Sequence, residues 1–361
     1  MKRKWYLLLV IFASFLSACK KNIPNAKCVE NSGTAALSEA RSSLAAAAAG
    51  SKIVFAGGRN ESGELSDVAD IYDVETNKWT VAKISVPRQD MAATAAGTKI
   101  FFAGGRDPNS IEYGVIDIYD VVTNEWSTAA LSEPRWGLAA AAIGNKVFFG
   151  GGNTGPTTYS SAVDIYDIIS KKWTIAHLSR DRGELAAAAT KTKVIFAGGY
   201  AAATVDIYDI TTNTWSVAEL SEPRRNLAAA AAGDKVVFAG GRPNFGSRTN
   251  TVDIYDAKTN TWSTSQFQEV KTDLAAATLG DKILIAGGDD IVEIFDTKSN
   301  SWSTTNLSHW RTTLAGASTR NKALFGGGWS ITPGSTVDMF ELVPCDDPGR
   351  PLKLSKPSSF K

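Results

Sequence analysis

The chain has 361 residues, of which 43% are hydrophobic and 21% charged, with 31 glycines and only 12 prolines. This is the composition of a globular protein, and it excludes an intrinsically disordered or collagen-like chain. The formal net charge of +1 argues against a nucleic acid or another polyanion as partner.

The N-terminal segment has the pattern of an export signal. Three basic residues, at positions 2–4, precede an apolar stretch that is too short for a stable membrane span. The stretch ends in Leu16-Ser17-Ala18-Cys19, which resembles the lipobox of bacterial lipoproteins. This resemblance implies cleavage before Cys19 and lipidation of that cysteine, whose several acyl chains would hold the protein at a membrane. The alternative is a plain secretory signal followed by a chance cysteine.

We therefore predict that residues 1–18 are a lipoprotein signal peptide and residues 19–27 a lipid-anchored tether. The implied localisation is the bacterial cell envelope. Lys20 follows the lipidated cysteine at a position where aspartate often signals retention in the inner membrane, so the outer membrane is favoured.

One pattern of residues then recurs seven times. Each copy has a run of small residues after a leucine or methionine, an apolar run closed by a glycine doublet, and a segment like "VDIYD"; six copies add a tryptophan. Alternating and β-branched residues predict four short strands per copy, separated by glycine doublets and by "TN" or "SN" turns. Seven such units imply a ring of packed sheets. The doublets are Gly57-Gly58, Gly104-Gly105, Gly151-Gly152, Gly198-Gly199, Gly240-Gly241, Gly287-Gly288 and Gly327-Gly328.

The order of glycine doublet, tyrosine and tryptophan resembles the Kelch repeat, which galactose oxidase shares. The resemblance implies an all-β, seven-bladed β-propeller with four-stranded antiparallel blades, here over residues 28–345. The first strand of each blade would lie beside the central axis. Small side chains fit there, which explains alanine runs such as residues 45–49 although alanine favours helices. We expect Tyr119, Trp126 and their equivalents to pack between blades.

The seventh copy lacks its tryptophan strand, and the missing strand is predicted at the other end of the chain. "TAALSEAR" at residues 34–41 matches the end of a fourth strand elsewhere, so residues 30–38 should complete the last blade and close the ring. That register places Cys28 and Cys345 on adjacent strands. Export implies an oxidising compartment, so we predict a disulfide between them that acts as a staple rather than as a redox centre. Residues 346–361 are expected to form a flexible C-terminal tail.

Only the segment between the second and third strands changes length between copies. Because strands reverse direction at each turn, this segment lies at the same end of the ring as the connections between blades. We call this end the loop face. Variable loops on a rigid scaffold often carry binding sites, so we predict that the ligand binds here.

Each connection on the loop face carries a cation three residues before the leucine or methionine. Sevenfold repetition places these cations in a circle around the mouth of the central channel. Two interpretations are open. The cations bind an anion, such as a carboxylate, a phosphate or an acidic peptide loop, or each cation pairs with the first acid of the "VDIYD"-like segment and pins the connection. The cations are Arg41, Arg88, Arg135, Arg182, Arg224, Lys271 and Arg311.

Several aromatic residues of the loop face lie outside the repeat pattern, among them Trp136, Trp310, Trp329 and Tyr200. Tryptophan in a polar loop is suited to stacking on a sugar or on a partner's side chain, so we predict ligand contacts. The alternative is that these rings cover the ends of the innermost strands. The Kelch resemblance favours binding, since such propellers commonly bind peptides or proteins through this face.

The sequence contains only two histidines and no motif typical of a metal site, an activated nucleophile or a phosphate loop. We therefore predict no catalytic residue, metal or cofactor. The favoured hypothesis is a monomeric, membrane-anchored binding protein without a nucleic-acid partner, which recognises a protein or glycan around the central channel. The alternative is a sugar-modifying enzyme similar to the neuraminate epimerases, acting on an acidic sugar in the central pocket. Asp90, Glu184 and Asp273 are its candidate acids or bases.

Overall fold

The structure is a computed structural model that describes residues 27–243 and 248–345. The predicted signal peptide, the lipidation site Cys19 and the predicted C-terminal tail lie outside these residues, as does nearly all of the tether. No helix long and apolar enough to cross a membrane occurs in the described part of the chain.

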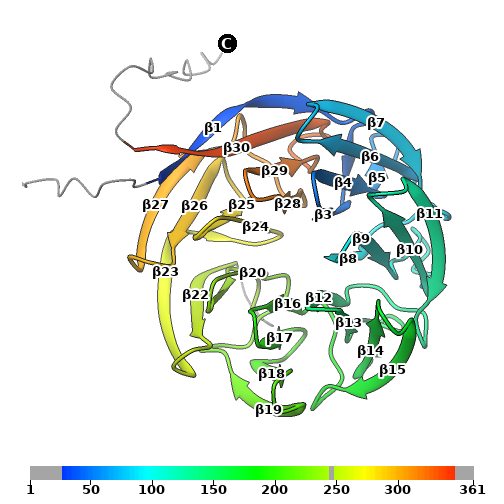
Figure 1. Cartoon of the computed structure of the whole chain (residues 1–361), viewed down its shortest axis with the longest axis vertical. Helices are drawn as coiled ribbons and strands as arrows, with labels where there is room; N and C mark the ends of the chain where they lie inside the picture. The colour runs from blue at the N-terminus through cyan, green and yellow to red at the C-terminus, as the bar shows by residue number, and fades with distance from the viewer. Residues whose placement is uncertain (1–26, 244–247, 346–361) are drawn as a thin grey trace, which may run out of the picture. The chain divides into compact units, whose positions relative to one another are not determined.

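The chain divides into two compact units, residues 29–342 and a smaller unit whose described residues are 27–28 and 343–345. The larger unit contains seven four-stranded antiparallel sheets arranged as the blades of a ring (Figure 1). The predicted all-β, seven-bladed propeller is therefore confirmed.

In blades one to six the strands follow one another from the axis outwards in chain order, whereas the outermost strand of blade seven is β1. Blade one consists of β3 (Ala45–Ala49), β4 (Lys52–Ala56), β6 (Val68–Asp73) and β7 (Lys78–Lys83), and blade two of β8 (Ala92–Ala96), β9 (Lys99–Ala103), β10 (Val115–Asp120) and β11 (Glu125–Ala130). Blade three consists of β12 (Ala139–Ile143), β13 (Lys146–Gly150), β14 (Ala162–Asp167) and β15 (Lys172–His177), and blade four of β16 (Ala186–Ala189), β17 (Lys193–Ala197), β18 (Thr204–Asp209) and β19 (Thr214–Glu219). Blade five consists of β20 (Ala228–Ala232), β21 (Lys235–Ala239), β22 (Thr249–Asp256) and β23 (Thr261–Lys271), and blade six of β24 (Ala275–Leu279), β25 (Lys282–Ala286), β26 (Ile291–Asp296) and β27 (Ser301–Asn306). Blade seven consists of β28 (Ala315–Ser318), β29 (Lys322–Gly326), β30 (Thr336–Pro344) and β1 (Lys27–Ala36). Two short strands, β2 (Arg41–Ser42) and β5 (Arg59–Asn60), pair on the loop face of blade one.

The alanine runs form the innermost strands. In β3 and β12 buried and half-buried residues alternate, as expected for strands with sheet neighbours on both sides of the blade. Innermost strands of adjacent blades contact one another, for example β8 and β12. The need for small side chains at this contact overrides the helix propensity of alanine.

The hydrophobic core lies between neighbouring blades. Val54 and Ile71 of blade one pack against Phe102 and Tyr119 of blade two, with Trp126 at the edge of the same cluster. The Tyr119 and Trp126 rings are 4.9 Å apart between centroids. The predicted packing role of this tyrosine and tryptophan is therefore confirmed.

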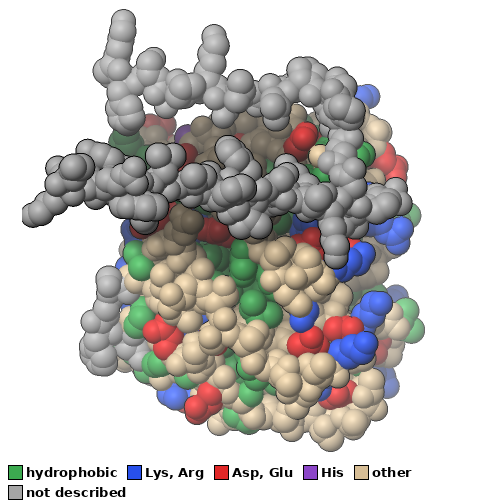
Figure 2. Space-filling model, turned by 90° about the vertical axis from the view of Figure 1, so that its left-hand side faces the viewer, with side chains coloured by type: hydrophobic (Ala, Val, Ile, Leu, Met, Phe, Trp, Pro, Cys, Tyr) green, Lys and Arg blue, Asp and Glu red, His purple; other side chains and the backbone are tan. Residues whose placement is uncertain are grey.

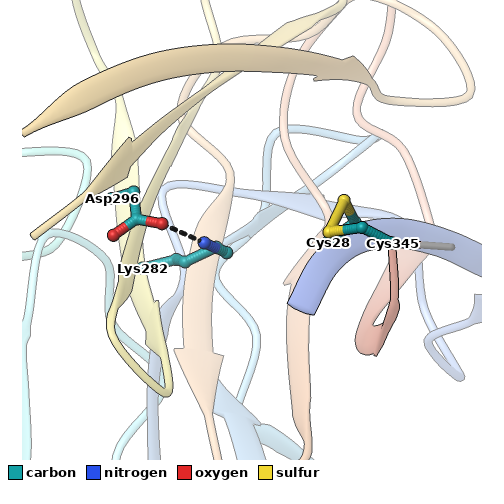
Figure 3. Close-up of a disulfide and its surroundings, with 4 residues drawn as sticks. All are labelled: Cys28, Lys282, Asp296 and Cys345. Carbon is teal, nitrogen blue, oxygen red and sulfur yellow. Dashed lines mark hydrogen bonds and ion pairs between the residues drawn. A yellow bond between two sulfur atoms is a disulfide. The ribbon is translucent and has the colours of Figure 1, made fainter. Parts of the chain in front are cut away.

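A lysine at the start of the second strand pins the end of the third strand in several blades. In blade six the Nζ atom of Lys282 lies 2.5 Å from a carboxylate oxygen of Asp296 (Figure 3). Lys99 and Asp120 make the equivalent pair in blade two at 2.8 Å. These pairs lie at the end of the blade opposite the loop face.

The outer wall of the ring has a mixed surface. Figure 2 shows basic and acidic side chains interspersed on the side that carries β22, β23, β26 and β27 in Figure 1.

The ring closes as predicted, because β1 pairs with β30 as the outermost strand of blade seven. A further hydrogen bond, from the N–H of Leu37 to the carbonyl of Ser335 (2.8 Å), continues this pairing beyond the end of β1. The N-terminal strand begins at Lys27, slightly earlier than the predicted segment.

The smaller unit holds the predicted disulfide. Cys28 lies in β1, Cys345 directly follows β30, and their Cα atoms are 5.0 Å apart in the bonded pair (Figure 3). The bond links residues 317 positions apart in the sequence.

Replacing Cys28 and Cys345 by serine is expected to lower the free energy of unfolding by up to about 5 kcal/mol, because the bond restricts the unfolded chain. Urea unfolding followed by tryptophan fluorescence measures the difference. A reductant should destabilise the unmodified protein by the same amount and leave the serine variant unchanged. Equal unfolding midpoints for the oxidised protein and the variant would contradict a stapling role.

Candidate functional site

All seven predicted cations are buried, with exposed fractions of 0 or 1%. Each forms an ion pair with the first acid of the "VDIYD"-like segment in its own blade, which is the pairing that one of the two interpretations predicts. The pairs are Arg41–Asp70, Arg88–Asp117, Arg135–Asp164, Arg182–Asp206, Arg224–Asp253, Lys271–Glu293 and Arg311–Asp338.

Blade two shows how the pair fixes its connection. Arg88 Nη2 lies 2.7 Å from Asp117 Oδ2, and Arg88 Nε donates to the carbonyl of Gly104 at 2.7 Å. The other carboxylate oxygen of Asp117 accepts the N–H of Ser85 at 2.9 Å. Burial lowers the pKa of Arg88, and the charge of Asp117 opposes this effect. The pair ties the connection between blades to the third strand.

The backbone of each cation also joins neighbouring blades. The second glycine of a doublet donates its N–H to the carbonyl of the next blade's cation, as in Gly105 to Arg135 at 3.0 Å. A Cβ atom on Gly104 would lie 2.3 Å from that carbonyl oxygen, so only glycine allows the approach. All seven blade junctions contain this bond: Gly58–Arg88, Gly105–Arg135, Gly152–Arg182, Gly199–Arg224, Gly241–Lys271, Gly288–Arg311 and Gly328–Arg41.

The pinning interpretation is therefore confirmed in every blade. In this arrangement each cation is paired with an acid and has almost no exposed surface, so a ligand on the loop face meets other groups first. Their assignment as ligand contacts stays a prediction.

A second ring lies two residues after each cation, and sequence analysis did not identify it as a ring. All seven residues have φ between 51° and 59°. Backbone hydrogen bonds link neighbouring members, as in Asn226 N–H to Glu184 carbonyl at 3.0 Å, except that Asn226 and Asp273 are linked by their side chains at 3.3 Å. Glycine, asparagine and aspartate tolerate this left-handed conformation, and their frequency at this position is the signal in the sequence. We call these residues the mouth ring: Ser43, Asp90, Gly137, Glu184, Asn226, Asp273 and Thr313.

The three acids of the mouth ring each pair with an arginine that lies outside the sevenfold pattern. The pairs are Asp90–Arg106, Glu184–Arg225 and Asp273–Arg242. Burial raises the pKa of Asp90, and the guanidinium of Arg106, 2.8 Å away, partly offsets the effect.

Two of the predicted aromatic contacts already have cationic neighbours. The guanidinium carbon of Arg106 lies 3.8 Å from the ring centroid of Trp136, and that of Arg225 lies 5.2 Å from the ring of Tyr200. Tyr200 also stacks on Tyr159, with centroids 5.6 Å apart. These contacts order the loop face over blades two to five.

The other two aromatic residues belong to blade seven. Trp310 and Trp329 expose 48% and 44% of their surface. The backbone of Trp329 is fixed, because Thr312 and Trp329 exchange two N–H to carbonyl hydrogen bonds of 2.8 and 2.7 Å. An exposed ring on a fixed backbone is a suitable ligand contact.

A pocket of about 560 Å³ opens where blades seven, one and two meet on the loop face. The mouth ring contributes the small hydroxyl residues Ser43 and Thr313 there, and Arg59, Asp90 and Trp329 also line the pocket. The structure thus brings one predicted aromatic contact and one predicted acid together in a single hollow.

Comparison with known families agrees with this architecture. The KLHDC2/KLHL20/DRC7 Kelch-repeats domain matches residues 137–328, and the Kelch motif matches residues 40–83 and 87–130. A search of curated proteins found no match.

Replacing Arg88 by leucine is expected to lower the free energy of unfolding by about 3–5 kcal/mol, because it leaves Asp117 buried without its partner. Urea unfolding of the purified protein measures the loss. Arg59→Leu is the control, since this exposed arginine makes its hydrogen bond to the carbonyl of Gly63, forms no ion pair with a described carboxylate, and should change stability by less than about 1 kcal/mol. Equal stabilities for the two variants would show that the buried pair does not hold the blade.

Proposed function

The chain belongs to the Kelch-repeat family, and on this basis we propose that it is a binding protein of the bacterial cell envelope. Kelch propellers generally mediate protein interactions. The protein is held at the membrane by a lipid on Cys19 and acts as a monomer. It recognises a protein or glycan ligand on the loop face around the central channel.

One observation carries the proposal more than any other. Trp310 and Trp329 are exposed on the loop face. Trp310 lies in the connection that the buried Arg311–Asp338 pair fixes, and the backbone of Trp329 is bonded to Thr312 of the same connection. A preorganised site avoids much of the entropy cost of ordering loops on binding. Exposed tryptophans on such a site are typical anchors of a recognition surface.

The other predicted contacts have distinct parts in this proposal. Trp136 and Tyr200 extend the surface across blades three and four, each with an arginine over its ring. The seven buried cations hold the loops in position. The membrane anchor is supported by the lipobox sequence alone.

Replacing Trp310 and Trp329 together by alanine is expected to abolish capture of the partner, because the exposed rings supply most of the anchoring contact. Affinity capture from the native cell envelope, with cross-linking and identification of the bound material, measures this.

The matched control is Val122→Ala with Ile169→Ala. These side chains are 70% and 71% exposed, and they lie on turns between third and fourth strands, at the end of the ring opposite the loop face. This variant should capture the partner as well as the unmodified protein does. Capture by the tryptophan variant at the unmodified level would contradict the proposal.

A second candidate function, modification of an acidic sugar, is favoured by the surroundings of Asp90. This carboxylate lines the pocket beside Arg106, and burial raises its pKa, which suits a group that exchanges protons with a bound substrate. The arginines of the pocket would hold the substrate's carboxylate.

If the protein modifies sialic acids, Asp90→Asn should lower turnover about a hundredfold or more, because the amide cannot act as an acid or base. NMR of N-acetylneuraminate incubated with purified protein follows the reaction, and Glu184→Gln tests the other candidate acid in the mouth ring. Absence of turnover by the unmodified protein, or full activity in Asp90→Asn, would exclude this role.

A further inference from the structure

The arginine that directly follows a glycine doublet provides an internal comparison between blades. Arg59 and Arg106 occupy this place in blades one and two. In blade two the mouth-ring residue is Asp90, and Arg106 forms an ion pair with it at 2.8 Å. For Arg59 the corresponding residue is Ser43, so blade one has the same arginine without its carboxylate.

Blade five shows the other way in which such an arginine is satisfied. Arg242 follows the doublet there, its own mouth-ring residue is Asn226, and it pairs instead with Asp273 of the next blade at 3.1 Å. For Arg59 the mouth-ring residue of the next blade is Asp90. This acid is already paired with Arg106, so it is not available to Arg59 in the same way.

Arg59 is therefore left without an acidic partner among residues 27–243 and 248–345. Its Nε atom donates to the carbonyl of Gly63 at 2.8 Å, which fixes the guanidinium and leaves the two Nη groups for a ligand. A guanidinium held in this way is suited to bind a carboxylate through two parallel hydrogen bonds.

The surroundings of Arg59 identify the kind of carboxylate. Arg59 lines the pocket of about 560 Å³, together with Trp329 and the hydroxyl and amide side chains of Ser43, Asn60 and Gln89. An indole face receives the apolar side of a pyranose ring, and hydroxyl and amide groups exchange hydrogen bonds with sugar hydroxyls. The pocket volume is within the usual range for small-molecule sites.

We propose that this pocket binds a sugar acid, whose carboxylate takes the place at Arg59 that Asp90 takes at Arg106, and whose ring lies against Trp329. The proposal rests on the proposed function, because it names the ligand class of the same loop face. Glu61 and Asp90 also line the pocket, and the charge of Asp90 is offset by Arg106. A peptide carboxylate would satisfy Arg59 as well, but the polar lining favours a polyol over an apolar peptide side chain.

Isothermal titration of the purified mature protein with D-glucuronate and D-glucose tests the proposal. Glucuronate should bind about tenfold more tightly or better, because only it offers a carboxylate to Arg59. Ser43→Asp supplies the missing carboxylate from the protein itself and should weaken glucuronate binding about tenfold or more. The backbone at Ser43, with φ of 54°, matches that of Asp90 at 57°, so aspartate fits there without strain.

Arg59→Met should weaken glucuronate binding in the same way, and it tests the same contact if Ser43→Asp fails to fold. Arg242→Met is the matched control and should leave binding unchanged, because Arg242 pairs with Asp273 away from the pocket.

Equal affinity for glucuronate and glucose, or unchanged glucuronate binding in both Ser43→Asp and Arg59→Met, would overturn the proposal. Arg59-dependent binding of N-acetyl-aspartate amide without binding of glucuronate would also overturn it, in favour of an acidic peptide. If partner capture depends on Trp310 and Trp329 while the unmodified protein binds no glucuronate, the sugar-acid proposal fails and the binding function stands.

Discussion

The buried ion pair between each blade's cation and the first acid of its third strand is the interaction on which the rest of the structure depends. Charges that are removed from water destabilise a fold unless they are paired and hydrogen-bonded, so the geometry of such a pair is strongly specified. In blade two the pair fixes the incoming connection, and the carbonyl of the same arginine accepts a bond from Gly58 of the preceding blade. A cation at one position of each blade therefore sets both the loop and the junction between blades.

This scaffold lets the mouth of the channel vary without loss of order. The mouth ring keeps one backbone conformation in all seven blades, whereas its side chains differ. Where the ring residue is an acid, as at Asp90 and Asp273, an arginine closes over it. Beside Ser43 and Thr313 a pocket opens, which Trp329 and the Asp90–Arg106 pair border. The loop face is thus asymmetric because a few side chains of the mouth ring differ between blades, although the backbone conformation repeats.

The sequence predicts the fold well because the fold is repeated. Seven copies of the doublet, the alanine run and the tryptophan segment define the strands, and the copy that lacks its last strand reveals the closure by β1 and the pairing of Cys28 with Cys345. The site is less accessible to such reasoning. Sevenfold repetition of the cations is compatible both with buried ion pairs and with anion binding, so the repeat alone does not decide between them. The Arg242–Asp273 pair joins residues of two different blades, so the periodicity of a single repeat does not reveal this pair. The indole side chains of Trp136 and Trp329 are equivalent candidates in the sequence. In the structure Arg106 covers the indole of Trp136, whereas the indole of Trp329 is exposed.

The most direct test of the central claim is a double-mutant cycle on Arg88 and Asp117, with leucine at either or both positions and stability measured by urea unfolding. A buried pair that holds the blade predicts a coupling free energy of about 2 kcal/mol or more, with the double variant more stable than the sum of the single losses implies. Losses that add to within about 0.5 kcal/mol would show that the two residues act independently, and the account of the ring as a scaffold built on these pairs would be wrong.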